Sequence, residues 1–341
     1  MRAMAVVDYT APLQLIELPE PEVKPGSVLI RVLACGVCYS DLKIAHGWMP
    51  YSATLRLPHV PGHEISGELV EAHPETGFQA GDRVVVYHYW ACGRCFYCQR
   101  GQENLCVNLE AWAGFTHPGG FEEFLVVPAP WLLRVPVGIT PEQAAPATCA
   151  SGTAYRAVVT RGRVQPGDTV VILGVGGVGL QALQMANVAG ARVLAVDINP
   201  RKLEAARRLQ AAGVALAGPE AETLIRDHTA NLGADVIIDT TGHSDALDQA
   251  SHWLRRGGRI VGVGYTVGKL AAIQSDLLVL SEIEVVGSRY AQRYEVERVL
   301  TLFASGKVQP IIDQVLPLEA ANEALSRLEK GEVIGRTVLR I

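Results

Sequence analysis

The chain has 341 residues, enough for two domains of ordinary size. Its hydrophobic fraction of 49% and charged fraction of 19% are those of a folded globular protein rather than a disordered one. The net charge of −5 provides no basic excess for nucleic acid, and no apolar run is long enough to span a membrane.

The cysteines indicate the compartment. The chain has seven, an odd number, and several stand at C-x-x-C spacing. Residues 1–22 meet charges and prolines too early for a secretory leader. We therefore expect a cytoplasmic protein, in which clustered cysteines bind metal more often than they form disulfides.

The first part of the chain, residues 1–148, is typical of a strand-rich, barrel-like domain. Valine-rich runs are short and bounded by proline, glycine and other turn residues. The strands are expected near residues 27–35, 67–72, 82–89 and 121–128.

From about residue 165 strands and helices alternate, which predicts an α/β fold with a doubly wound parallel sheet. The expected strands are 168–174, 192–197, 234–242 and 259–265, and the expected helices are 178–190, 199–213 and 244–258. Two further helical stretches, 294–307 and 318–331, and a strand at 336–341 are expected to return to the first domain.

A glycine loop lies between the first strand and first helix of this alternation, and contains Gly174, Gly176, Gly177 and Gly179. Glycines there let the backbone approach a pyrophosphate at the helix N-terminus. Asp197 ends the next strand, where its carboxylate can bind the ribose hydroxyls of NAD and repel the 2′-phosphate of NADP.

Arg201 and Lys202 nearby leave NADP as the minor alternative. A flavin or other nucleotide site, or a packing turn without ligand, is the alternative to a dinucleotide site.

Four cysteines at C-x2-C-x2-C-x7-C spacing suit a closed tetrahedral zinc site, with no position left for substrate. They are Cys92, Cys95, Cys98 and Cys106. An iron–sulfur cluster and a nucleic-acid zinc ribbon are the alternatives. The first usually has a proline after its last cysteine, where Val107 stands here, and the second requires a basic surface.

Three scattered residues form a second candidate set: Cys38, His63 and Cys149. Two thiolates and one imidazole make three protein ligands, the number that a catalytic zinc binds while its fourth position stays open. Each residue alone is unremarkable, because a lone cysteine is usually a buried hydrophobe.

Together these motifs resemble the zinc-dependent alcohol dehydrogenases of the medium-chain dehydrogenase/reductase superfamily, most closely the short tetrameric bacterial and archaeal forms. The matching segments span nearly the whole chain in family order and include "GVCYSDLKIAHG", "PGHEISG", "CGRCFYCQRGQENLC", "TCASGTAYRA" and "VVILGVGGVGLQALQMA". The resemblance implies a GroES-like, β-rich catalytic domain over residues 1–148 and 290–341. It also implies a Rossmann NAD-binding domain over residues 149–289.

The resemblance also implies roles for single residues near the metal. Cys38, His63 and Cys149 would hold the catalytic zinc, and Glu64 would lie beside it as a transient ligand. Ser40 would bind the substrate oxygen and start a proton relay. Lys43 stands where the family relay ends in a histidine, so the relay can end at Lys43, at His46 or in water.

For the cofactor, the resemblance implies contacts from the loop residue Val178 and from Lys202. Arg336 would bind the pyrophosphate. The positions that would line the nicotinamide are Thr153, Val261, Ser288 and Tyr290.

The expected activity is reversible, NAD-linked oxidation of primary and secondary alcohols to aldehydes and ketones, with two zinc ions per chain. Zinc would polarise the alcohol oxygen while hydride passes to the nicotinamide. The alternative is a polyol, threonine or acyl-CoA-linked alcohol dehydrogenase of the same superfamily. Some of Trp48, Trp90 and Trp112 are expected to wall an apolar substrate pocket, although barrel-core positions are equally compatible with their sequence context.

The expected partners are a small alcohol, aldehyde or ketone substrate and further copies of the chain. The apolar segment 281–288 reads as an edge strand, which in the family pairs with its two-fold mate. We expect a homotetramer, with a dimer as the alternative, and no nucleic-acid or membrane partner.

Overall fold

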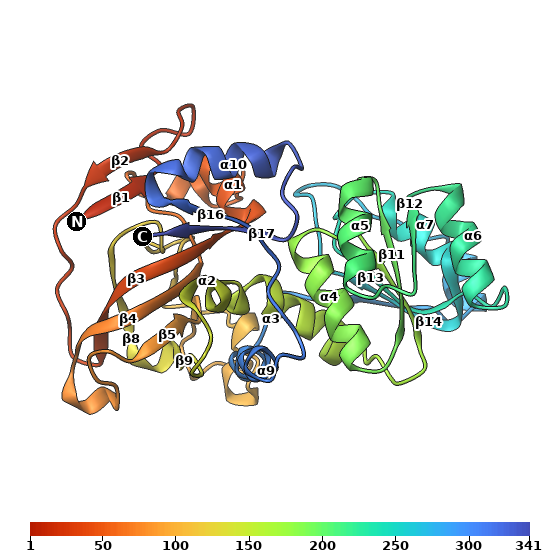
Figure 1. Ribbon diagram of the computed structural model, residues 1–341, viewed down its shortest axis with the longest axis horizontal. Coiled ribbons are helices and arrows are strands. Elements are labelled where there is room, and N and C mark those ends of the chain that lie inside the picture. Colours follow the sequence, from red (N-terminus) through yellow and green to blue (C-terminus); the bar gives the residue numbers. More distant parts are fainter. The chain divides into compact units, whose positions relative to one another are not determined.

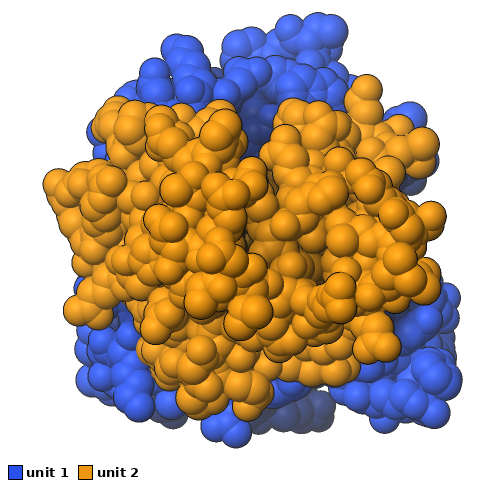
Figure 2. All heavy atoms as spheres, turned by 90° about the vertical axis from the view of Figure 1, so that its right-hand side faces the viewer, with its two compact units in different colours: residues 1–152, 291–341 blue, residues 153–290 orange.

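The computed structural model describes residues 1–341 and divides into two compact units, coloured separately in Figure 2. The first unit comprises Met1–Gly152 and Ala291–Ile341, and the second comprises Thr153–Tyr290. The first unit therefore includes Cys149, which the expected division placed in the second domain. None of the helices has the length and apolar character needed to cross a membrane.

The second unit is built on a six-stranded sheet in which every neighbouring pair is parallel, in the order β12-β11-β10-β13-β14-β15. Its central strands are almost continuously apolar and fully buried, as expected for a parallel sheet covered on both faces. This arrangement confirms the predicted α/β fold class. The strands are β10 (Thr169–Leu173), β11 (Arg192–Asp197), β12 (Gly213–Leu216), β13 (Ala234–Asp239), β14 (Leu254–Gly262) and β15 (Glu284–Gly287).

The helices of the second unit begin where the sequence places starting signals. In α5, for example, the Asn199 side chain accepts a hydrogen bond from the Arg201 N–H, and Pro200 occupies the first helical position. The core joins strand residues such as Val171 and Ile237 to Ile225 and Trp253 of the helices. The helices are α4 (Gly177–Val188), α5 (Pro200–Arg208), α6 (Pro219–His228), α7 (Ala246–Trp253) and α8 (Ser275–Leu280).

One helix ends earlier than the sequence pattern predicts. The segment 244–258 is expected to be helical, yet α7 ends at Trp253 and β14 begins at Leu254. Gly257 has a φ of +67°, and a Cβ on Gly258 would lie 2.8 Å from the Arg255 carbonyl oxygen. The two glycines therefore favour an irregular strand over the expected helical turn.

The first unit contains a seven-stranded sheet that runs β16-β17-β3-β4-β5-β9, with β8 also paired to β3. The last strand of the chain, β17, lies beside β3 (Figure 1) and pairs with it antiparallel, with Thr337 opposite Val37. Two small sheets, β1-β2 and β6-β7, complete the unit. The strands are β1 (Arg2–Ala5), β2 (Gln14–Glu17), β3 (Ser27–Val37), β4 (Glu64–Ala72), β5 (Arg83–Val86), β6 (Tyr89–Trp90), β7 (Ala111–Trp112), β8 (Phe124–Pro128), β9 (Leu132–Arg134), β16 (Ile312–Pro317) and β17 (Arg336–Arg340).

Short helices fill the connections of this unit, and α10 lies beside α1 (Figure 1). The helix α3 crosses the division between the units and is followed in the second unit by a π-helical turn over Arg156–Arg161. The helices are α1 (Tyr39–Ala45), α2 (Pro141–Ala144), α3 (Ala150–Tyr155), α9 (Arg293–Ala304) and α10 (Ala321–Glu329).

The first unit buries a carboxyl group, that of Glu122. Glu122 is 2% exposed, its backbone forms a β-bridge with Ala3, and its Oε2 has no hydrogen-bond partner. Burial raises the pKa of Glu122 to about 8. The protonated form is therefore favoured in the folded protein near neutral pH.

This burial predicts a pH-dependent stability difference between the wild type and Glu122→Gln. Because the folded-state pKa, about 8, lies above the ordinary value of 4.5, the stabilising protonation is fully present below pH 4.5 and is lost as pH rises to 8. We expect the wild type to lose up to ~1.4 kcal/mol per pH unit relative to Glu122→Gln within that window.

The measurement is the difference in melting temperature between the two proteins from pH 5 to pH 9. The control is Glu123→Gln, because Glu123 is ion-paired with Arg2 at 2.9 Å and the pKa of its carboxyl is lowered by that hydrogen bonding. The contribution of Glu123 to the stability of the folded protein therefore changes only at acidic pH. A pH-independent difference for Glu122→Gln would contradict a buried, protonated Glu122.

Candidate metal and cofactor sites

A buried carboxylate, Asp41, organises the first candidate metal site. It lies in the first turn of α1, where its Oδ2 accepts a hydrogen bond from the Cys38 N–H at 2.8 Å. Its Oδ1 accepts from the Gly62 N–H at 3.2 Å and lies 2.9 Å from the His63 Nδ1. With Nδ1 directed at the carboxylate, the Nε2 of His63 is the nitrogen available to a metal ion.

Four side chains converge beside this carboxylate. The ligand atoms of Cys38, His63, Glu64 and Cys149 all lie within 4.8 Å of one another, and all four residues are buried. The His63 Nε2 is 3.3 Å from the Cys149 Sγ, close to the ~3.6 Å that tetrahedral zinc bonding of one nitrogen and one sulfur requires. The donor set and its spacing therefore fit zinc.

Arg336 of β17 reaches the same cluster and is only 6% exposed. Its Nε donates to both carboxylate oxygens of Glu64, at 3.0 and 3.2 Å, and its Nη2 lies 3.6 Å from the Cys38 Sγ. Sequence analysis assigned Arg336 to the cofactor pyrophosphate, a role that stays a prediction. The contact with Glu64 is one that sequence analysis did not foresee.

The cluster perturbs the ionisation of its members. A hydrogen bond from the Cys149 thiol, together with the charge of Arg336, holds the pKa of Cys38 well below its ordinary value. Burial lowers the pKa of His63, but the charge and hydrogen bond of Asp41 outweigh it and raise that pKa to about 10. Burial raises the pKa of Glu64 even though Arg336 opposes the shift. Cys38 is thus prepared as the thiolate that a metal needs.

The second candidate metal site is the four-cysteine lobe, residues 92–106. The Sγ–Sγ distances are 3.4 Å for Cys95–Cys98, 3.6 Å for Cys92–Cys106, 3.9 Å for Cys95–Cys106 and 4.0 Å for Cys92–Cys98. Four thiolates around one zinc at 2.3 Å would be ~3.8 Å apart. An iron–sulfur cluster would bind the thiolates through different irons and needs wider spacing. The lobe therefore fits a single, closed zinc site.

The candidate proton-relay residues lie along α1. Ser40 is partly exposed in its first turn. Lys43 is half-buried, its ammonium lies 5.7 Å from the centre of the Tyr39 ring, and burial lowers its pKa against the opposing charge of Cys38. His46 is exposed and stacks on Trp48, with ring centres 4.6 Å apart.

The three tryptophans occupy different environments. Trp112 is buried and stacks on Phe115 at 3.8 Å, and the Phe115 ring lies 4.7 Å from that of His63. Trp90 is buried beside His117, whereas Trp48 is 51% exposed. Trp112 therefore belongs to an aromatic stack that reaches the metal cluster through Phe115. Sequence analysis missed Phe115, because no motif distinguishes it.

The glycine loop has the geometry of a phosphate-binding turn. Gly174 has a φ of +84°, and a Cβ on Gly179 would lie 1.9 Å from the Gly174 carbonyl oxygen. A Cβ on Gly176 would meet open space, at the residue that caps the N-terminus of α4. Asp197 ends β11 beside this loop, and its Oδ2 accepts a hydrogen bond from the Val175 N–H at 2.8 Å.

The other predicted cofactor residues are distributed over both units. The second unit contains Val178 in the first turn of α4, Lys202 in α5, Val261 in β14 and buried Thr153. It also contains Ser288, whose N–H donates to the Gly262 carbonyl at 2.8 Å, and Tyr290, which has a φ of +45°. Arg336 belongs to the first unit.

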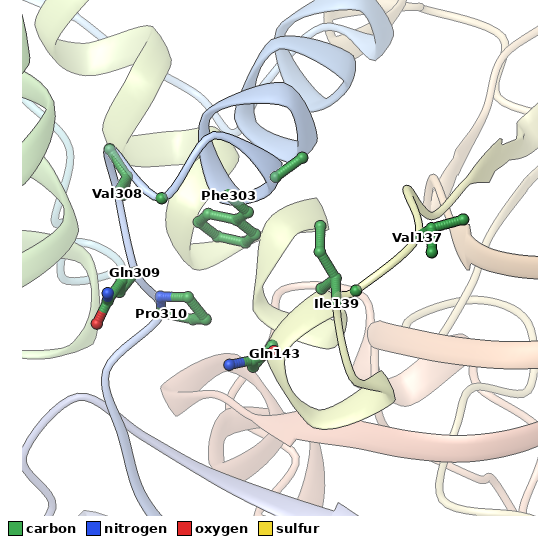
Figure 3. A pocket seen from close by; sticks show the side chains of 10 residues that line it. Val137, Ile139, Gln143, Phe303, Val308, Gln309 and Pro310 are labelled. Atoms are coloured by element: carbon green, nitrogen blue, oxygen red, sulfur yellow. The ribbon is translucent and has the colours of Figure 1, made fainter.

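A separate pocket of about 260 Å³ lies in the first unit between α2 and the end of α9 (Figure 3). Its labelled side chains are mainly apolar, with Phe303, Ile139 and Pro310 around the hollow. No member of either metal cluster lines it. We assign it no part in the metal chemistry.

Comparison with known proteins identifies the family. Residues 24–137 match the family described as "Alcohol dehydrogenase GroES-like domain", and residues 177–305 match "Zinc-binding dehydrogenase". An alcohol dehydrogenase of Geobacillus stearothermophilus is 37% identical over 346 aligned positions that cover 100% of both chains. An NAD-dependent alcohol dehydrogenase of Sulfurisphaera tokodaii is 35% identical, with 99% of each chain covered.

Similarity to a solved structure supports the same family. The alcohol dehydrogenase from the hyperthermophilic archaeon Aeropyrum pernix has a TM-score of 0.92 and 32% identity, with 100% of both chains covered. The two units thus define a zinc-binding oxidoreductase with a GroES-like domain and a dinucleotide-binding domain. The chain belongs to the alcohol dehydrogenases of the medium-chain dehydrogenase/reductase superfamily, as its sequence motifs predict.

The position of Asp41 predicts that Asp41→Asn weakens zinc binding at the first site only. The amide removes the negative charge that orients His63, and loss of such a partner typically lowers metal affinity about 10–100-fold. Competition with a chromogenic zinc chelator measures the zinc affinity of the protein. Only the affinity of the first site should fall, because the four-cysteine lobe does not involve Asp41.

The matched control is Asp8→Asn, which changes an exposed carboxylate that accepts hydrogen bonds only from Thr10. It should leave both zinc affinities unchanged. Equal affinities in Asp41→Asn and Asp8→Asn would show that Asp41 does not support the metal ligand.

Proposed function

We propose that the protein catalyses the reversible oxidation of small primary and secondary alcohols to aldehydes and ketones, with NAD as the hydride acceptor. The observation that carries this proposal is the convergence of Cys38, His63 and Cys149 in one buried cluster, whose fourth member, Glu64, has its carboxylate bound by Arg336. Three ligands leave a coordination position for substrate. The four-cysteine lobe has no such position and acts as a structural site.

The chain's own residues handle the proton. When bound, zinc supplies a Lewis acid for the alcohol oxygen, and NAD accepts the hydride. Ser40 binds the substrate hydroxyl and receives its proton. Lys43 is the next acceptor, supported by its partial burial and by the lowered pKa of its ammonium group. Exposed His46 and water are the other possible ends of the relay.

The glycine loop and Asp197 hold the cofactor. The N-terminus of α4, where Gly176 leaves open space, would hold the pyrophosphate, and Arg336 would supply a further positive charge. Asp197 binds the adenosine ribose, with Lys202 beside it, and Thr153, Val261, Ser288 and Tyr290 line the nicotinamide. NAD agrees with the names of three relatives, which are described as NAD-dependent alcohol dehydrogenases, and zinc agrees with the family description "Zinc-binding dehydrogenase".

Aromatic rings beside the metal cluster favour an apolar alcohol over the polyol, threonine and acyl-CoA alternatives. The stack of Trp112 on Phe115 lies against His63. Such rings pack well against alkyl and aromatic groups but offer no hydrogen-bond partners to the further hydroxyl groups of a polar substrate. Aliphatic, cyclic and aromatic alcohols are therefore the proposed substrates.

We further propose that the protein is a homodimer that doubles to a tetramer and works in the cytoplasm. The edge strand β15 and the residues before it expose several apolar side chains, among them Val279, Leu280 and Val285. Pairing of this edge with the same edge of a second copy of the chain, related by a two-fold axis, would cover these side chains. A reducing compartment keeps the six cysteines of the two candidate metal sites available for metal.

The first experiment measures zinc content and NADH formation with a panel of alcohols. We expect about two zinc ions per wild-type chain and activity with aliphatic, cyclic or aromatic alcohols. Cys38→Ser should retain about one zinc and lose turnover. Full activity in Cys38→Ser, or a preference for sorbitol or threonine, would contradict the proposal.

The cofactor assignment predicts the behaviour of Asp197→Gly. Removing the carboxylate abolishes its repulsion of a 2′-phosphate, so the ratio of kcat/KM for NADP to that for NAD should rise by at least about tenfold, equivalent to ~1.4 kcal/mol. Steady-state kinetics with both cofactors measures it. An unchanged ratio would remove Asp197 from the ribose site.

A further inference from the structure

The four-cysteine lobe is tied to the beginning of α9 by one carboxylate. Glu103 lies between Cys98 and Cys106, and its Oε1 accepts a hydrogen bond from the backbone N–H of Arg293. Arg293 is the first residue of α9. The first N–H groups of a helix lack partners within the helix and carry a partial positive charge, so a carboxylate stabilises them.

This helix start follows closely on the point where the chain leaves the second unit. The second unit ends at Tyr290, and the first unit resumes at Ala291. The buried Tyr87 hydroxyl donates to the Ala291 carbonyl at 2.8 Å. A Cβ on Gly152, the residue at which the chain first leaves the unit, would lie 2.9 Å from the Ala291 Cβ. Close packing and two hydrogen bonds therefore fix the backbone at residues 291–293.

We propose that the four-cysteine lobe positions the cofactor-lining segment Ser288–Tyr290 through Glu103 and the first turn of α9. The inference rests on the proposed function only for the role of that segment at the nicotinamide. Glu103 is a positioning residue, because it touches neither substrate nor cofactor. The lobe thus has a role beyond holding its own loop together.

The geometry explains why the metal matters for this contact. Glu103 belongs to a single 3-10 turn, Glu103–Leu105. Cys98 precedes this turn and Cys106 follows it, and both belong to the four-cysteine set. A single turn of this length is not stable without contacts to the rest of the protein. Metal binding at the cysteines therefore fixes the Glu103 carboxylate opposite the Arg293 N–H.

The test uses Glu103→Gln in the full-length zinc enzyme, with Glu110→Gln as the matched control. Glu110 lies just beyond the lobe and is exposed. We expect amide hydrogen exchange of residues 293–297 to accelerate about tenfold in Glu103→Gln, because a hydrogen bond to a charged group is replaced by a neutral one. The Kd for NAD, measured by fluorescence titration, should rise about three- to tenfold while zinc content stays unchanged.

A second arm tests the link to the metal. Partial removal of zinc from the four-cysteine site by a chelator should accelerate exchange at residues 293–297 in the wild type and in Glu110→Gln. It should add little in Glu103→Gln, where the connection is already broken. If Glu103→Gln does not fold, Glu103→Asp, which keeps the charge but shortens the reach, takes its place.

The outcomes separate this inference from the proposed function. Unchanged exchange in Glu103→Gln, or equal effects of the chelator in all three proteins, overturns the link between the lobe and α9. Faster exchange with an unchanged Kd for NAD overturns the positioning role. Absence of NAD binding to the wild type contradicts the proposed function instead, and the exchange experiment still decides the link.

Discussion

The first candidate metal site depends on a single buried carboxylate. Asp41 is fully inaccessible, and an isolated carboxylate in such a place would be very costly. Three donors offset the cost: the N–H groups of Cys38 and Gly62 and the imidazole of His63. The same contacts join the beginning of α1 to the loop before β4. The hydrogen bonds that offset the burial of the Asp41 carboxylate are thus the ones that position two candidate metal ligands, Cys38 and His63.

Charge balance extends outward from this carboxylate. Asp41 faces the imidazole of His63, and Glu64 faces the guanidinium of Arg336. Two thiolates remain, and they match the formal charge of a divalent metal ion. Because Glu64 has a cation in contact and Asp41 has three N–H donors, the site avoids the penalty of unpaired buried charge. Removing one member leaves its partner uncompensated, so single substitutions here disturb more than one contact.

Sequence alone located the parts of the protein whose signals are local. The four-cysteine lobe lies within fifteen residues, Cys92 to Cys106, and the glycine loop has its strand and helix on either side. The functional contacts of Asp41 and Arg336 could not be found this way. Asp41 meets an imidazole 22 residues away, and Arg336 meets a carboxylate 272 residues away. Only the fold brings them together, and the resemblance to a family pointed Arg336 toward a different partner.

The pairing of β17 with β3 has a consequence for the order of assembly. The cysteine lobe closes over a short stretch of chain, so its loop entropy is small and it can take up metal early in folding. The first site instead needs Cys38 at the end of β3, Cys149 and an arginine at position 336, which arrives only when β17 joins the sheet. Long-range contacts of this kind form slowly. Metal should therefore enter the lobe first, while the reactive centre is completed last.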